Sequence, residues 1–66
     1  NIFAYERVLD NEILLVISSF SNKALICKVM KKYENYKKNI LLNNYSTFEN
    51  YYLKPYQSVL LYIKKN

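Results

Sequence analysis

The sequence predicts a small all-β domain, an antiparallel Greek-key β-sandwich of about five or six strands. Aromatic and β-branched residues, which suit strands, gather in short runs along the chain. Turn-forming residues separate these runs at intervals of roughly 8–12 residues, the spacing typical of sandwiches and barrels. With 66 residues and no linker or internal repeat, the chain is expected to form one domain over residues 1–66.

The first predicted element is a β-hairpin. Its first strand covers residues 2–8, and its second covers the most apolar run, residues 13–20. Because that run is almost continuously apolar, we expect a central strand buried on both faces or nearly so. Asp10 and Asn11 lie between the strands, and both tolerate the left-handed backbone angles that a tight turn requires.

Further strands are predicted along the rest of the chain. A helix over residues 23–36 competes with one of them, but three lysines interrupt its apolar stripe, so residues 30–36 are predicted to be a loop. Pro55 ends another strand, because proline has no N–H to donate to a neighbour. The predicted strands cover residues 24–29, 38–43, 48–53 and 58–63.

The chain carries little of the chemistry that an enzyme site needs. Without histidine or glycine it lacks the commonest general base and a phosphate-binding loop. Its five carboxylates include no pair predicted to face each other across a cleft, as glycoside hydrolysis requires. The single cysteine, Cys27, is expected to be a small core residue. We therefore expect no catalytic residue, no metal site and no cofactor in this chain.

The net charge of +5 has two interpretations. It could attract an anionic partner, but Lys, Asn, Ile and Tyr are abundant together and share AT-rich codons, so genome composition accounts for it as well. The lysines do not alternate with aromatic residues on one strand, so no nucleic-acid partner is expected. No apolar run is long enough to span a membrane, and no signal peptide is visible, so no membrane partner and a cytoplasmic location are expected.

The tyrosines beyond the first strand are another candidate for a site. They are compatible with a stacking platform for sugars or bases, with ordinary packing in which the hydroxyl stays in water, or with an interface to another domain. These tyrosines are Tyr33, Tyr36, Tyr45, Tyr51, Tyr52, Tyr56 and Tyr62.

Four segments occur in a characteristic order: residues 2–7 (IFAYER), 14–21 (LLVISSFS), 41–45 (LLNNY) and 53–58 (LKPYQS). They are similar to the patterns vFAY-x-R, LLVI-x-NFS, LL-x-NY and LRPYEA. In this order the segments resemble the C-terminal β-domain of α-amylase-family glycoside hydrolases of the oligo-1,6-glucosidase, α-glucosidase and trehalose-6-phosphate hydrolase type. The chain departs from the family pattern in three polar residues, Ser19, Lys54 and Gln57, where Asn, Arg and Glu are usual.

The resemblance implies a role without catalysis of its own. The parent protein would be a retaining α-glucosidase whose (β/α)8 catalytic barrel precedes this segment and holds all the catalytic carboxylates. This chain would be the accessory domain that packs on the barrel and stabilises it. Its first residue, Asn1, is not a start methionine, which agrees with a piece of a longer protein.

The resemblance also suggests where the barrel would be contacted. Phe3, Tyr5 and Arg7 on the first strand, with Pro55 and Tyr56, are expected on or near that interface; the alternative is that they belong to the domain's own core or to an exposed rim. A stand-alone carbohydrate-binding module is an alternative function, against which the absence of tryptophan counts. A nucleic-acid-binding module is a weaker one. The isolated chain is also expected to be able to self-associate through its strand edges.

Overall fold

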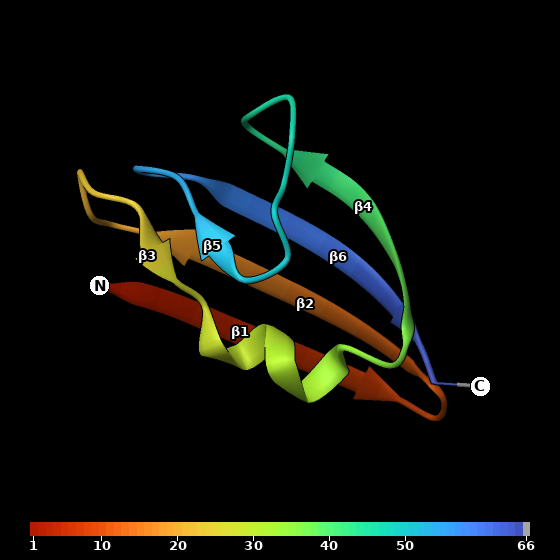
Figure 1. The fold of residues 1–66 in the computed structure, drawn as a ribbon. Coiled ribbons are helices and arrows are strands. Elements are labelled where there is room, and N and C mark those ends of the chain that lie inside the picture. The colour runs from red at the N-terminus through yellow and green to blue at the C-terminus, as the bar shows by residue number, and fades with distance from the viewer. Residues whose placement is uncertain (66) are drawn as a thin grey trace.

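The computed structural model describes residues 1–65 and confirms the predicted antiparallel all-β fold (Figure 1). One 3₁₀ helix, η1, interrupts the strands. In chain order the elements are β1 (Ile2–Leu9), β2 (Glu12–Ser19), β3 (Leu25–Ile26), η1 (Lys28–Tyr33), β4 (Lys37–Asn43), β5 (Tyr52–Leu53) and β6 (Ser58–Lys64).

Four of the strands form one antiparallel sheet with the order β1-β2-β6-β4. The last strand, β6, inserts between β2 and β4, so the connection that leads from β2 to β4 crosses over the position that β6 fills. The β1–β2 hairpin closes through Asp10 and Asn11, and Asp10 adopts a φ of 55° as its turn position requires. The hairpin prediction is therefore confirmed, with strand ends shifted by a residue.

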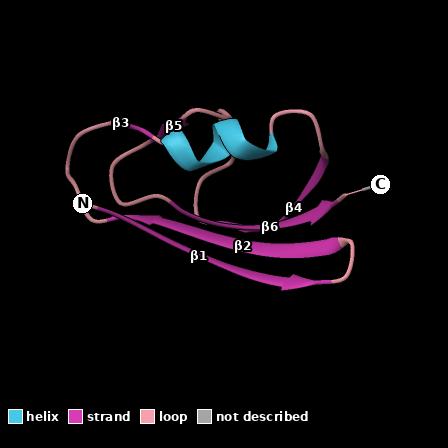
Figure 2. Ribbon diagram, turned by 90° about the horizontal axis from the view of Figure 1, so that it is seen from below, coloured by secondary structure: helices cyan, strands magenta, loops and turns pink. Residues whose placement is uncertain are grey.

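A second, smaller layer covers one face of this sheet. The antiparallel pair β3–β5 and the helix η1 lie together on that side (Figure 2). Alternate residues of β2 and β6 point into the space between the layers and are buried, whereas their neighbours in sequence point away. The core consists of Ile13, Leu15, Ile17, Cys27, Met30, Tyr33, Leu53, Val59, Leu61 and Ile63.

The segment predicted as a strand and a loop instead holds the two-residue strand β3 and the six-residue helix η1. Cys27, Met30 and Tyr33 are buried at intervals of three residues, which is the repeat of a 3₁₀ helix, and the lysines between them face solvent. Lys38 Nζ donates to the carbonyl oxygens of Tyr33 at 2.8 Å and Tyr36 at 2.9 Å, and so satisfies acceptors at the end of η1. The strand predicted at 24–29 was therefore too long, and the loop predicted at 30–36 was wrong because it contains most of η1.

Three other expectations need correction. The second strand is buried on one face only, because Leu14 on its other face is 40% exposed. The strand predicted at 48–53 is reduced to β5 and an isolated bridge between Glu49 and Tyr52. Tyr33 is not available for stacking on a ligand, since it is fully buried in the core.

Within residues 1–65, no helix is long and apolar enough to cross a membrane.

Candidate functional site

The face of the four-stranded sheet that points away from the second layer is the largest candidate for an interaction surface. We call it the outer face. In Figure 2 no described element lies across it. Residues paired across antiparallel strands point to the same side, so the strand register defines its members. They are Phe3, Tyr5, Arg7 and Leu9 of β1, Glu12, Leu14, Val16 and Ser18 of β2, Ser58, Leu60, Tyr62 and Lys64 of β6, and Lys37, Asn39 and Leu42 of β4.

The outer face is apolar in the middle and polar at both ends, at one of which Ser58 Oγ donates to Ser18 Oγ at 3.0 Å. Tyr5 pairs with Val16, and Val16 pairs in turn with Leu60, so branched and aromatic side chains lie side by side across three strands. Phe3 is 51% exposed and Tyr5 is 53% exposed, values that are large for side chains of this size in a folded domain. At the hairpin end, Glu12 pairs with Lys64 and forms a charged border.

The residues predicted to contact another domain fall into two groups. Phe3, Tyr5 and Arg7 occupy alternate positions of β1 and share the outer face. Pro55 and Tyr56 lie instead in the turn that leads into β6, where Tyr56 is 57% exposed and Pro55 is half-buried. The turn is anchored near the start of β1, since Tyr56 N donates to Ser21 O at 3.1 Å and Phe20 N donates to Asn1 O at 2.8 Å.

Sequence reasoning missed most of the outer face. Leu14, Leu60 and Leu42 belong to it but were assigned only to strands, and Tyr62 was grouped only with the other tyrosines. The sequence does not show which strands are neighbours. β6 pairs with β2 although β3, η1, β4 and β5 lie between them in the chain. A signal was present in the alternation of β6, where Val59, Leu61 and Ile63 are buried and the residues between them are not.

A buried amide organises the turn that contains Pro55 and Tyr56. Gln57 is fully buried, and its Oε1 accepts from Lys54 N at 2.9 Å. Its Nε2 donates to Asn43 Oδ1 at 3.0 Å and to Thr47 O at 2.9 Å. Because one amide serves as both acceptor and donor, it holds the end of β4, the following loop and the turn together. Tyr45 reinforces the turn, since its hydroxyl donates to Pro55 O at 2.6 Å.

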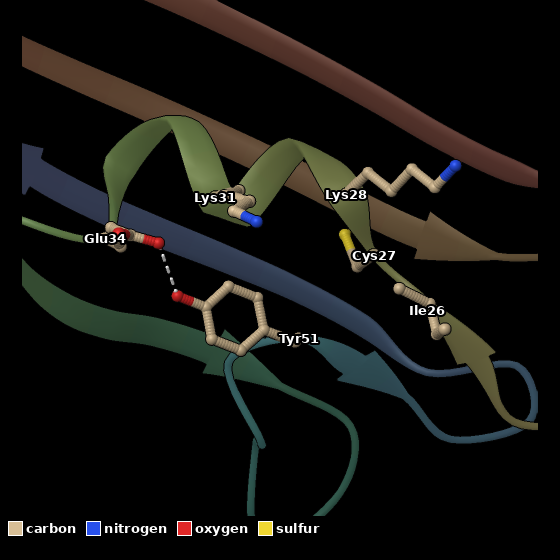
Figure 3. A pocket seen from close by; sticks show the side chains of 6 residues that line it. All are labelled: Ile26, Cys27, Lys28, Lys31, Glu34 and Tyr51. Carbon is tan, nitrogen blue, oxygen red and sulfur yellow. Dashed lines mark hydrogen bonds between the residues drawn. The ribbon is translucent and has the colours of Figure 1, made fainter.

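A shallow depression lies on the opposite side of the molecule, where η1 meets β5 (Figure 3). Tyr51 donates its hydroxyl proton to Glu34 Oε1 at 2.9 Å, and this hydrogen bond to the carboxylate raises the pKa of Tyr51. A second bond, from Cys27 N to Tyr51 O at 2.7 Å, joins the same segments. Burial raises the pKa of the Cys27 thiol, which keeps it protonated and unreactive at neutral pH. These contacts fasten η1 to β5.

The tyrosines are dispersed over the molecule. Among the described residues, the one aromatic pair in ring contact is Tyr33 and Tyr36, with centroids 6.4 Å apart, and Tyr33 is buried. Tyr62 lies on the outer face, where the nearby carboxylate of Glu12 raises the pKa of Tyr62. The rings therefore pack and anchor loops individually, and they do not line up as a stacking platform.

The carboxylates are likewise separated. Glu6 forms an ion pair with Lys32 at 3.2 Å, on the side of β1 that faces η1. Within residues 1–65, no three metal-ligating side chains gather at one place.

No family model matches this chain, and a search of curated proteins finds no match to it.

Proposed function

We propose that this chain is a non-catalytic accessory domain that packs on, and stabilises, the (β/α)8 catalytic barrel of an oligo-1,6-glucosidase- or α-glucosidase-like enzyme. The parent enzyme hydrolyses α-glucosidic bonds in the cytoplasm. The observation that carries the proposal is the uncovered apolar outer face, on which Phe3, Tyr5 and Arg7 lie together.

An uncovered face of this kind supports a permanent neighbour. Exposed apolar patches of several hundred Å² are uncommon on domains that act alone and favour interaction sites. Covering about 500 Å² of apolar surface contributes roughly 12 kcal/mol before ordering costs, at about 25 cal/mol/Å². That is comparable to the whole stability of a domain, typically about 5–15 kcal/mol, so a small domain gains substantially from such a partner.

The four segments that resemble the glucosidase family support the choice of partner. Two of them form the β1–β2 hairpin, the third ends β4, and the fourth leads from β5 into β6. At Gln57, a buried departure from the pattern, the amide fills its site with three hydrogen bonds. The resemblance thus concerns the elements that build the outer face and its adjoining turn.

In this proposal the chemistry belongs entirely to the barrel. No side chain of this chain touches the substrate, and substitutions on the outer face affect the enzyme through its stability. The charged residues Arg7, Glu12 and Lys64 form the solvent-exposed rim of the contact and lie outside its apolar centre.

The test uses the natural gene product that contains this segment. Its coding sequence upstream of Asn1 is expected to encode a (β/α)8 barrel, and the purified protein is expected to hydrolyse p-nitrophenyl α-glucoside. The double variant Phe3→Ser/Tyr5→Ser should lower its melting temperature by about 5 °C or more, since it removes apolar area from the contact. The kcat/KM of the enzyme that remains folded should not change.

Ile26→Ser is the matched control. Ile26 is 59% exposed but lies in β3, away from the outer face, so its replacement should leave the melting temperature nearly unchanged. A natural gene product without a barrel, or equal effects of the two replacements, contradicts the proposal. Binding of maltooligosaccharides by the isolated chain would identify it instead as a carbohydrate-binding module.

A further inference from the structure

The two edges of the four-stranded sheet are not equally protected against pairing with another strand. β4 forms one edge, and it begins with Lys37 and Lys38 and carries a register shift between Ile40 and Leu42. Lysines and bulges are the usual means by which proteins block an edge. β1 forms the other edge as a regular eight-residue strand with an unbroken register and no lysine or proline.

The backbone groups that β1 leaves free can be identified from the register. Phe20 N donates to Asn1 O, so this pair belongs to the hydrogen-bonded set, and hydrogen-bonded and non-bonded pairs alternate along antiparallel strands. Phe3, Tyr5, Arg7 and Leu9 therefore bond to β2. The N–H and C=O groups of Ile2, Ala4, Glu6 and Val8 point to the open edge. Ala4 and Val8 are exposed, which leaves the edge accessible.

We propose that a second copy of this chain pairs with β1, antiparallel and centred on Tyr5, to give a continuous eight-stranded sheet. Residues that pair across antiparallel strands must point to the same face, which limits the registers. Centring on Tyr5 joins Ile2 to Val8 of the second copy and Ala4 to Glu6 of the second copy. The free N–H and C=O groups of β1 in both copies are then all bonded, in about eight new hydrogen bonds. A shift to the next allowed register would form about two hydrogen bonds fewer.

The side chains favour the same register. On the outer face Tyr5 meets Tyr5 of the second copy, and Phe3 meets Arg7 of the second copy, a pair suited to a cation–π contact. Centring on Glu6 would instead place two carboxylates directly opposite each other, which is unfavourable. Glu6 is the one acidic residue in β1, and its charge is already balanced by Lys32 of its own copy.

This pairing is distinct from the proposed contact with a barrel. The barrel would cover side chains on the outer face, whereas the second copy bonds to backbone groups at the edge. An experiment that rules out one of these two contacts therefore does not rule out the other.

Sedimentation and amide exchange of the 66-residue chain test the proposal. A concentration-dependent dimer is expected, with a Kd on the order of 10 µM. In the dimer the amides of Ala4, Glu6 and Val8 should become protected, while those of Tyr5 and Arg7, already bonded to β2, are protected in both states. Ala4→Pro, which removes one edge N–H, should weaken dimerisation about tenfold or more, whereas Ala4→Ser keeps that N–H and should not.

Cysteine cross-linking tests the register. Non-bonded antiparallel pairs bring Cα atoms to about 4.5 Å, within the range of a disulfide, so Tyr5→Cys should form an interchain disulfide on oxidation. Phe3→Cys alone should not, because its partner in this register is Arg7; Phe3→Cys with Arg7→Cys should. A chain that stays monomeric at about 1 mM, an edge whose amides stay unprotected in the dimer, or equal cross-linking of the two single variants overturns the proposal. A dimer that Phe3→Ser abolishes but Ala4→Pro does not would indicate association through the outer face and would overturn it too.

Discussion

Gln57 Nε2 donates to Asn43 Oδ1 at 3.0 Å, and this contact joins the turn before β6 to the end of β4. The same nitrogen donates to Thr47 O at 2.9 Å, so both amide protons are bonded inside the fold. A carboxylate at this position could not supply these protons. The surroundings of residue 57 are therefore matched to an amide.

Gln57→Glu is accordingly expected to destabilise the domain. At neutral pH the change removes two donors from a fully buried site and adds a charge, which should cost about 3 kcal/mol in urea unfolding. The deficit should shrink at acidic pH, where a protonated carboxyl regains one donor. Asn50→Asp, the same chemical change at an exposed position in the loop between β4 and β5, should alter the free energy of unfolding by less than about 0.5 kcal/mol.

Tyr33 carries a buried hydroxyl that lacks a hydrogen-bond partner. Removing an unsatisfied buried hydroxyl relieves its desolvation penalty, so Tyr33→Phe should raise the free energy of unfolding by about 1 kcal/mol. Tyr45→Phe makes the same change where the hydroxyl does have a partner, Pro55 O, and should lower stability. Equal effects in thermal unfolding would mean that the Tyr33 hydroxyl is satisfied in solution.

Cys27 should make stability depend on pH above neutrality. Burial raises the pKa of its thiol from the ordinary value of 9.0, so the folded state holds the proton more tightly than the unfolded state. The corresponding stability is fully present below pH 9 and is lost as the pH rises toward the folded-state pKa. Cys27→Ala should therefore flatten the fall of unfolding free energy above pH 9, whatever its effect at neutral pH. An unchanged slope would show that the thiol titrates normally.

The local signals of the sequence predicted the sheet well. The hairpin could be predicted because its strands are adjacent in sequence and a two-residue polar turn separates them. β6 could be predicted because Pro55 precedes it and its apolar run is short. For the hairpin and for β6, the local sequence pattern is enough to predict the strand that forms.

The helix η1 and the outer face could not be predicted in the same way. Over residues 24–29 the alternation resembles a strand, and the three-residue repeat of Cys27, Met30 and Tyr33 becomes informative only once all three are known to be buried. The outer face depends on β6 lying between β2 and β4, a long-range pairing that local periodicity does not specify. Phe3, Tyr5 and Arg7 could be grouped because they alternate on one strand, whereas Pro55 and Tyr56 lie in a turn whose position depends on Gln57.

Nitration of tyrosine in the natural gene product tests the central claim, that another domain covers the outer face. Tyr5 and Tyr52 are 53% and 51% exposed in this chain, but only Tyr5 lies on the outer face. In the isolated chain, at concentrations low enough to keep it monomeric, the two should react with tetranitromethane at similar rates, as followed by mass spectrometry. In the natural gene product we expect Tyr5 to react roughly tenfold more slowly while Tyr52 is unchanged. Equal reactivity of Tyr5 in both proteins would contradict the account.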